Sequence, residues 1–149
     1  MDKKITPISS PRLLLNAEAF GFGPTAAIAG LFPHLRGAFD TIGYIGTGHS
    51  LDLQKDLDYN AFHDVTHIDI NSDEASDIFK HYDIVLTAMD SAVAKAAQKH
   101  GLRVIFYDAL TWYWPDIAPA AKRSDLYIGQ NFFGVEERIK HGFKNAVTV

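Results

Sequence analysis

Short apolar or β-branched runs alternate with helix-like segments along the whole chain, and this alternation limits the fold more than any other feature. Strands separated by helices of about ten residues are typical of right-handed βαβ units in a parallel sheet. We therefore predict an α/β fold with a mostly parallel sheet of about seven strands. The expected strands are Arg12–Ala17, Phe39–Gly46, Val65–Ile70, Asp83–Met89, Arg103–Asp108, Leu126–Gln130 and Ala146–Val149.

Capping residues support the helices of this pattern. Asp90 precedes an alanine-rich segment that ends before Gly101, and Ser72 stands before another helix start. The strand IVLTAM is apolar at nearly every position, which indicates that layers cover both faces of the sheet. The prediction is a Rossmann-like three-layer sandwich. Its helices are expected at Pro24–Leu35, Asp73–His81, Ser91–His100, Ile117–Lys122 and Val135–His141, with a short helix or ordered loop at Leu51–Tyr59.

Composition fits one globular domain over residues 1–149 and excludes several kinds of protein. The net charge of −4, without a basic run, argues against binding of nucleic acid through phosphates. The absence of cysteine excludes disulfides and thiolate chemistry and suits a reducing cytoplasm. No apolar run is long enough for a secretory signal or a membrane span, so we expect a cytoplasmic protein. The final NAVTV reads as a strand, either where a longer polypeptide was cut or as a terminal strand.

The run GFGPTA follows the first expected strand and contains Gly21, Gly23 and Ala26 in the G-x-G-x-x-A spacing of dinucleotide-binding turns. Three residues separate the strand from Gly21, whereas the fingerprint places its glycine almost at once. The second strand also lacks an acid at its end for a ribose hydroxyl. The run therefore favours a strand-to-helix turn that lets a ligand approach the backbone, and an NAD(P)-dependent oxidoreductase domain is the weaker alternative.

The residues after the other strands are the remaining candidates, because ligands bind beyond the carboxyl ends of parallel strands. His49 lies in the loop GTGHSLD and suits proton transfer, either as a ligand-contacting group or as a solvated loop residue. Thr87, Asp90 and Ser91 stand at a helix entrance, where they either cap the helix or contact a ligand. His63 and His67 are spaced for a metal only on a helix, and their segment reads as a strand, so no metal site is expected.

Four aromatic residues occur within the eight residues from Tyr107 to Trp114, beside Asp108. Aromatic faces pack against sugar rings or flat apolar ligands, and carboxylates accept hydrogen bonds from hydroxyls. The aromatic residues therefore form either a binding surface or a packing cluster. Asn131, with Phe132 and Phe133, repeats this combination after the sixth expected strand.

Four segments together resemble the N-terminal half of a GT-B glycosyltransferase. They are the turn GFGPTAAIAGLFPHLR, the GTGH loop, the unit YDIVLTAMDSAVAKAAQKHGLRVIFYD and the final SDLYIGQNFFGVEERIKHGFKNAVTV. The resemblance implies two Rossmann-like domains, of which this chain is the acceptor-binding one. A C-terminal domain would bind the UDP- or TDP-sugar donor, so a hexosyltransferase reaction would need both domains. The resemblance implies no metal, no cofactor in this domain, and a small-molecule acceptor and the C-terminal domain as partners.

Members of that family often carry the catalytic base just after the first strand, where this chain has no histidine. Glu18 or His49 is therefore expected to act as the base. The alternatives left open are a non-catalytic nucleotide-binding module, a sugar-nucleotide epimerase half and the oxidoreductase domain. The residues expected to bind the substrate are Phe20, Gly21, Phe22, Gly23, Thr87, Asp90, Asp108, Trp112, Trp114 and Asn131.

Overall fold

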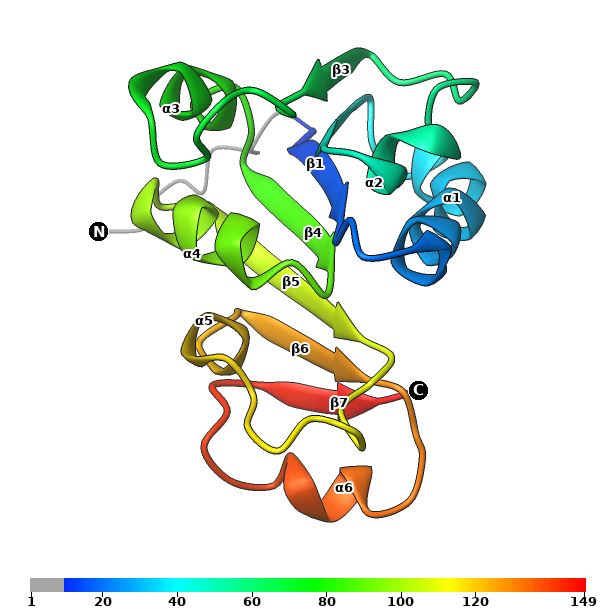
Figure 1. The fold of residues 1–149 in the computed structure, drawn as a ribbon, viewed down its shortest axis with the longest axis vertical. Coiled ribbons are helices and arrows are strands. Elements are labelled where there is room, and N and C mark those ends of the chain that lie inside the picture. The colour runs from blue at the N-terminus through cyan, green and yellow to red at the C-terminus, as the bar shows by residue number, and fades with distance from the viewer. Residues whose placement is uncertain (1–9) are drawn as a thin grey trace, which may run out of the picture.

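The computed structural model describes residues 10–149 and contains one seven-stranded sheet in the order β3-β2-β1-β4-β5-β6-β7 (Figure 1). Every neighbouring pair is parallel, so the expected sheet of about seven, mostly parallel strands is confirmed as fully parallel. The strands are β1 (Arg12–Ala17), β2 (Thr41–Gly46), β3 (Ala61–Asp64), β4 (Ile84–Ala88), β5 (Arg103–Asp108), β6 (Leu126–Gly129) and β7 (Ala146–Thr148).

Helices pack on both faces of the sheet. One face lies under α1 (Phe22–Arg36) and α2 (His49–Asp52), whose buried residues pack on strands β1, β2 and β4. The other face lies under α3 (Asp73–Phe79), α4 (Ser91–Lys99), α5 (Pro119–Lys122) and α6 (Val135–Arg138). In Figure 1, α1 and α2 flank the upper half of the sheet, and α5 and α6 accompany β6 and β7. The α/β Rossmann-like architecture predicted from the alternating pattern is confirmed.

One predicted strand is wrong. The third strand is Ala61–Asp64, and the expected strand Val65–Ile70 is a loop. The Asp64 carboxylate accepts hydrogen bonds from the backbone N–H of Thr66, at 2.9 Å, and from its hydroxyl, which closes a tight turn after β3. The apolar side chains that suggested a strand instead pack on the core from this loop: Val65, Ile68 and Ile70.

The predicted caps are confirmed. The Asp90 carboxylate accepts hydrogen bonds from the N–H groups of Ala92 and Val93, and Ser72 caps α3 through the N–H of Ala75. Gly101 has a φ of 75°, the left-handed conformation that ends a helix at glycine. The observed helices α3, α5 and α6 are shorter than predicted, and the expected Leu51–Tyr59 element begins inside α2 and continues as turns.

Among residues 10–149, no helix has the length and apolar character needed to cross a membrane. In the same range, no three histidine, aspartate or glutamate side chains are grouped so that they could hold a metal ion.

Candidate functional site

The carboxyl ends of β1 and β4 meet at the point where the strand order reverses. The chain leaves β1 toward β2 on one side and β4 toward β5 on the other, so a crevice forms outside these two strand ends. The substrate-binding positions expected from the sequence lie at the ends of strands or in the segments that follow them, and these strand ends share one edge of the sheet. The switch point is therefore where a ligand site is expected.

A buried polar network fixes the strand ends at this point. Asn16 Nδ2 donates to the Ile45 carbonyl at 2.9 Å, and the Thr87 hydroxyl donates to Asn16 Oδ1 at 2.6 Å. The backbone N–H of Asp90 reaches the Thr87 hydroxyl oxygen at 3.3 Å. Asn16 and Thr87 are both fully buried, so their hydrogen bonds compensate for lost hydration. The network joins β2, β1 and β4 and gives Thr87 a structural role.

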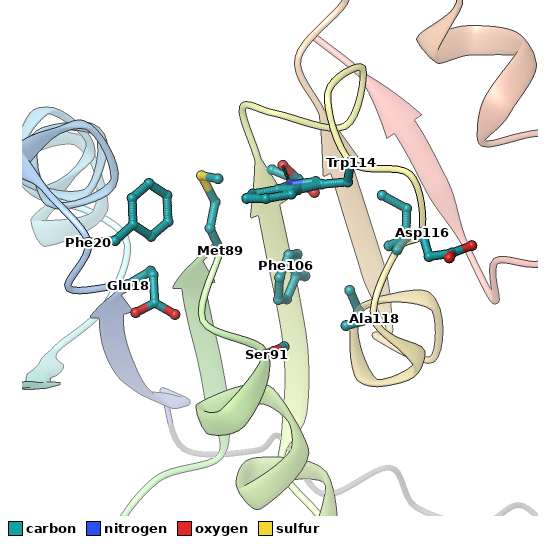
Figure 2. A pocket seen from close by; sticks show the side chains of 11 residues that line it. Glu18, Phe20, Met89, Ser91, Phe106, Trp114, Asp116 and Ala118 are labelled. Carbon is teal, nitrogen blue, oxygen red and sulfur yellow. Dashed lines mark hydrogen bonds between the residues drawn. The ribbon is translucent and has the colours of Figure 1, made fainter.

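The first cavity at this edge, here called the acidic cavity, has a volume of about 280 Å³. Figure 2 shows Glu18 and Phe20 on one side of it, Trp114 and Asp116 on the other, and Met89 between them. Acidic and aromatic side chains thus face the same space, from the end of β1 and from the loop after β5. The lining is completed by Ser91, Phe106, Asp108, Ile117, Ala118 and Ala121.

A second cavity of about 510 Å³, the apolar cavity, lies against the start of α1. Gly21 has a φ of 142°, which a side chain would disfavour, and Gly23 leaves open space where a Cβ would stand. Phe20 and Phe22 are each about half exposed there. The lining is predominantly apolar and consists of Phe20, Gly21, Phe22, Gly23, Pro24, Ala27, Met89, Tyr107, Ala109, Leu110 and Gln130.

A third cavity of about 350 Å³, the side cavity, lies beyond β2 and is lined by Glu18, Thr47, Thr66 and Asp90 among others. Glu18 borders both the side cavity and the acidic cavity. Burial, reinforced by the charge of Glu18, raises the pKa of Asp90 to about 6, although backbone N–H groups oppose this shift. Asp90 therefore changes protonation near neutral pH at the edge of the candidate site.

The loop between β5 and α5 is held in place by buried hydrogen bonds. Asp108 accepts from the Leu110 N–H at 2.7 Å and from the Tyr127 hydroxyl at 2.8 Å, and Trp114 Nε1 approaches it at 3.4 Å. The Arg138 guanidinium of α6 donates to backbone carbonyls of the same loop. Asp108 is 3% exposed, so its carboxylate orients the wall of the acidic cavity.

Four expected site residues lie outside these cavities, and one of them is Thr87, whose hydroxyl is engaged in the buried network. The His49 ring packs on Phe22, with ring centroids 5.0 Å apart, and its Nδ1 lies 3.4 Å from Asp52 Oδ2. Trp112 is about half exposed and packs on Tyr113 and Phe132. Asn131 Nδ2 reaches Glu136 on the surface. Glu18 and Trp114 therefore converge on one cavity, whereas His49, Trp112 and Asn131 do not.

Sequence reasoning missed Met89, which lines two of the cavities. It was assigned to the end of a strand, and its side chain carries no charge or proton that would single it out. Its position between the buried strand β4 and the N-cap residue Asp90 was the available signal, because ligands bind beyond the carboxyl ends of parallel strands.

Fold and cavities together define a Rossmann-like domain with a candidate ligand crevice at its switch point. Two crystal structures of UGT89C1 from Arabidopsis thaliana, a plant UDP-glycosyltransferase with the GT-B fold, are similar to this chain. The complex with quercetin has a TM-score of 0.58 and 14% identity, and covers 95% of this chain and 50% of that one. The complex with UDP has a TM-score of 0.53 and 15% identity, and the match covers 95% of this chain and 52% of that one.

This chain thus spans about half the length of the solved structures that it matches. No protein-family model matches the sequence, and no match was found among curated proteins. The likeness is one of fold, and it agrees with the Rossmann-like domain that the resemblance implied.

Proposed function

We propose that this chain is the acceptor-binding half of a glycosyltransferase that moves a sugar from a nucleotide-sugar to an acceptor hydroxyl. The observation that carries the proposal is the acidic cavity, where the Glu18 carboxylate and the rings of Phe20 and Trp114 face one space at the switch point. The similarity to half of a plant UDP-glycosyltransferase supports the same function. The partners are then a small-molecule acceptor and a C-terminal domain that binds the UDP- or TDP-sugar donor.

Glu18 is the proposed general base. Its carboxylate takes the proton from the acceptor hydroxyl, whose oxygen attacks the anomeric carbon of the donor. The bond from that carbon to the diphosphate oxygen breaks, and the nucleoside diphosphate leaves with the electron pair. The Glu18 backbone N–H donates to the Ala88 carbonyl at 2.9 Å, so the residue is anchored to the end of β4. His49 is the alternative base, and Glu18 is favoured because it lines the acidic cavity, whereas His49 lines none of the three cavities.

Flat apolar acceptors fit the remaining lining. Aromatic rings of Phe20 and Trp114 offer faces for stacking, and the apolar cavity next to them has room for further rings. Because the donor site belongs to the second domain, this domain alone is expected to bind the acceptor without turning it over. A chain without cysteine suits a reducing compartment, and we place the reaction in the cytoplasm.

Binding measurements test this proposal directly. We expect quercetin, the ligand in the similar plant structure, to shift backbone amide NMR signals around Glu18, Phe20 and Trp114. UDP and NAD⁺ are expected to leave those signals unchanged, because this domain lacks the donor site and the ribose-binding acid. Tight binding of NAD⁺ would contradict the proposal and favour an oxidoreductase domain.

The role of Glu18 needs a second measurement, made on the enzyme completed by its donor-binding domain. Glu18→Gln is expected to lower kcat about 100-fold or more, with KM for the acceptor within a few-fold of the wild-type value. Glu136→Gln is the matched control, because Glu136 is an exposed acid outside the cavities. An unchanged kcat in Glu18→Gln would contradict the role of Glu18 as the base and would favour His49.

A further inference from the structure

Met89 has a backbone conformation that side chains disfavour. Its φ is 70°, and within residues 10–149 it is the single non-glycine residue with a positive φ. The left-handed region crowds a Cβ against the following carbonyl, and glycine is the residue that adopts it freely. A methionine at this position is therefore strained where a glycine would be relaxed, which directs attention to its side chain.

The surrounding hydrogen bonds hold this conformation. The Met89 N–H donates to the Tyr107 carbonyl of β5 at 3.0 Å. The next residue, Asp90, is fixed by its N–H to the Thr87 hydroxyl and by its capping of α4. The backbone between β4 and α4 is thus constrained on both sides of Met89, and the turn would keep its shape with a smaller side chain.

The Met89 side chain lies on the boundary between two cavities. Met89 and Phe20 are the two residues that line both the acidic cavity and the apolar cavity. Figure 2 shows Met89 standing between Phe20 and Trp114, with its sulfur at the outer end of the side chain. The left-handed backbone aims the side chain into this gap, where an unbranched thioether fills an irregular space well.

We propose that Met89 is a specificity-determining residue, whose side chain separates the two cavities and limits how far a flat acceptor extends from one into the other. This inference rests on the proposed acceptor-binding function. A one-ring phenol fits the acidic cavity, of about 280 Å³, without crossing the boundary. A ligand of three fused or linked rings gains contacts in the apolar cavity, of about 510 Å³, once the boundary is open.

Three substitutions separate the side chain from the backbone strain. Met89→Leu keeps the volume and the strain, Met89→Ala removes the boundary and keeps the strain, and Met89→Gly removes both. The Tm of Met89→Gly is expected to exceed that of Met89→Ala by a few degrees, since glycine is relaxed at this φ. This comparison also shows that the variants fold.

Methionine methyl groups give the readout. The chain has two methionines, so a sample labelled with [¹³C-methyl]methionine gives two signals, and Met89→Leu assigns the signal from Met89. The wild-type Met89 signal is expected to shift when 4-nitrophenol or quercetin is added, because aromatic rings then lie beside it. Dissociation constants for both probes are measured from backbone amide shifts in all four proteins.

The ratio of the two dissociation constants decides the inference. In Met89→Ala and Met89→Gly, we expect the preference for quercetin over 4-nitrophenol to be at least five-fold greater than in the wild type. Met89→Leu should keep the wild-type ratio. An unchanged ratio in all variants, or a change in Met89→Gly alone, would overturn the role of the side chain while leaving acceptor binding intact. If neither probe bound the wild type or any variant, the acceptor-binding function would be overturned, and this inference with it.

Discussion

The two halves of the sheet differ in how the face under α1 is covered. In the part formed by β2, β1 and β4, side chains such as Leu15 and Ile42 are completely buried beneath α1 and α2. In the half formed by β5, β6 and β7, Tyr107 and Ile128 are only partly buried, and Val147 is 42% exposed. The opposite face is buried on both sides of the boundary between the halves, as Leu14 of β1 and Val104 of β5 show, each at 0% exposure.

The comparison shows that helix coverage, more than strand composition, sets the burial of these strands. Strand β1 is buried at five consecutive positions, whereas β5 and β6 alternate between buried and partly buried positions with similarly apolar sequences. A separate apolar cavity of about 470 Å³ lies beside α1, at the point where this helix no longer covers the sheet. Leu31, Tyr107 and Ile128 border it. The candidate site occupies the boundary between the two halves.

The largest expected effect uses two isoleucines on the same face. Ile42→Ala should lower the free energy of unfolding by about 3–4 kcal/mol, since the fully buried side chain leaves a cavity under α1. Ile128→Ala should cost about 1–2 kcal/mol, because that side chain is partly exposed already. Urea unfolding of both variants measures the difference. Equal losses would mean that β6 is covered on this face as fully as β2.

A second expected effect concerns the loop between β5 and α5, which belongs to the half that helices cover on one face only. Asp108→Ala should lower the free energy of unfolding by about 2–3 kcal/mol, because it removes the acceptor of the Leu110 N–H and of the Tyr127 hydroxyl. The fluorescence of Trp114, whose indole N–H points at Asp108, should change as well. Asp116→Ala is the control from the same loop, and this exposed residue should change stability by less than about 0.5 kcal/mol.

At the boundary between the halves, Asp90 should make stability depend on pH. Its pKa in the folded protein is about 6, above the ordinary 3.8, so its contribution is fully present below pH 3.8 and is lost as the pH rises through 6. Asp90→Asn does not titrate and still caps α4. The stability of Asp90→Asn relative to wild type should therefore rise by about 2 kcal/mol between pH 4 and pH 7.

Urea unfolding at several pH values measures this difference for Asp90→Asn. The matched control is Ser72→Ala, which removes the cap of α3 without removing a titrating group. Its loss of about 1 kcal/mol should be the same at each pH. A difference between wild type and Asp90→Asn that is constant from pH 4 to pH 7 would contradict the raised pKa.

The smallest expected effect is that of a substitution at Val147, with Val104 on the other face as the comparison. Val147→Thr should change the free energy of unfolding by less than about 0.5 kcal/mol, since the new hydroxyl stays in contact with water. Val104→Thr should cost about 2 kcal/mol, because it buries a hydroxyl without an assured partner on the covered face. Thermal unfolding of both variants checks this, and a loss at Val147 as large as that at Val104 would remove the contrast between the two faces.

Much of the fold could be predicted because local signals and tertiary packing agree. The apolar run of β4, the Asp90 cap and Gly101 fixed one βαβ unit from the sequence. Strand β3 was missed because AFHD is short and lies at the sheet edge, whereas the next residues are rich in β-branched side chains. Val65, Ile68 and Ile70 pack on the core from the loop after Asp64, and a short β-branched run does not distinguish such a loop from a strand.

The location of the candidate site could be predicted from the sequence, but only some of the residues that line it could. Parallel strand ends located the crevice, and Glu18 and Trp114 were expected at it and line it. Whether His49 and Trp112 point into the crevice depends on loop geometry: a ring contact with Phe22 holds His49, and packing on Phe132 holds Trp112. The role of Met89 depends on a backbone angle that leaves no trace in residue type.

The pairing of β1 with β4 has a consequence for the order in which the chain can fold. Strand β1 takes its second neighbour from a segment about half a chain away, and the Arg12 guanidinium contacts Asp83 across 71 residues. Closing so long a loop must precede the contacts that reward it, so folding is expected to be slow. During synthesis, β1 keeps an open edge until β4 has emerged, and an unpaired strand edge favours aggregation of the nascent protein in this interval.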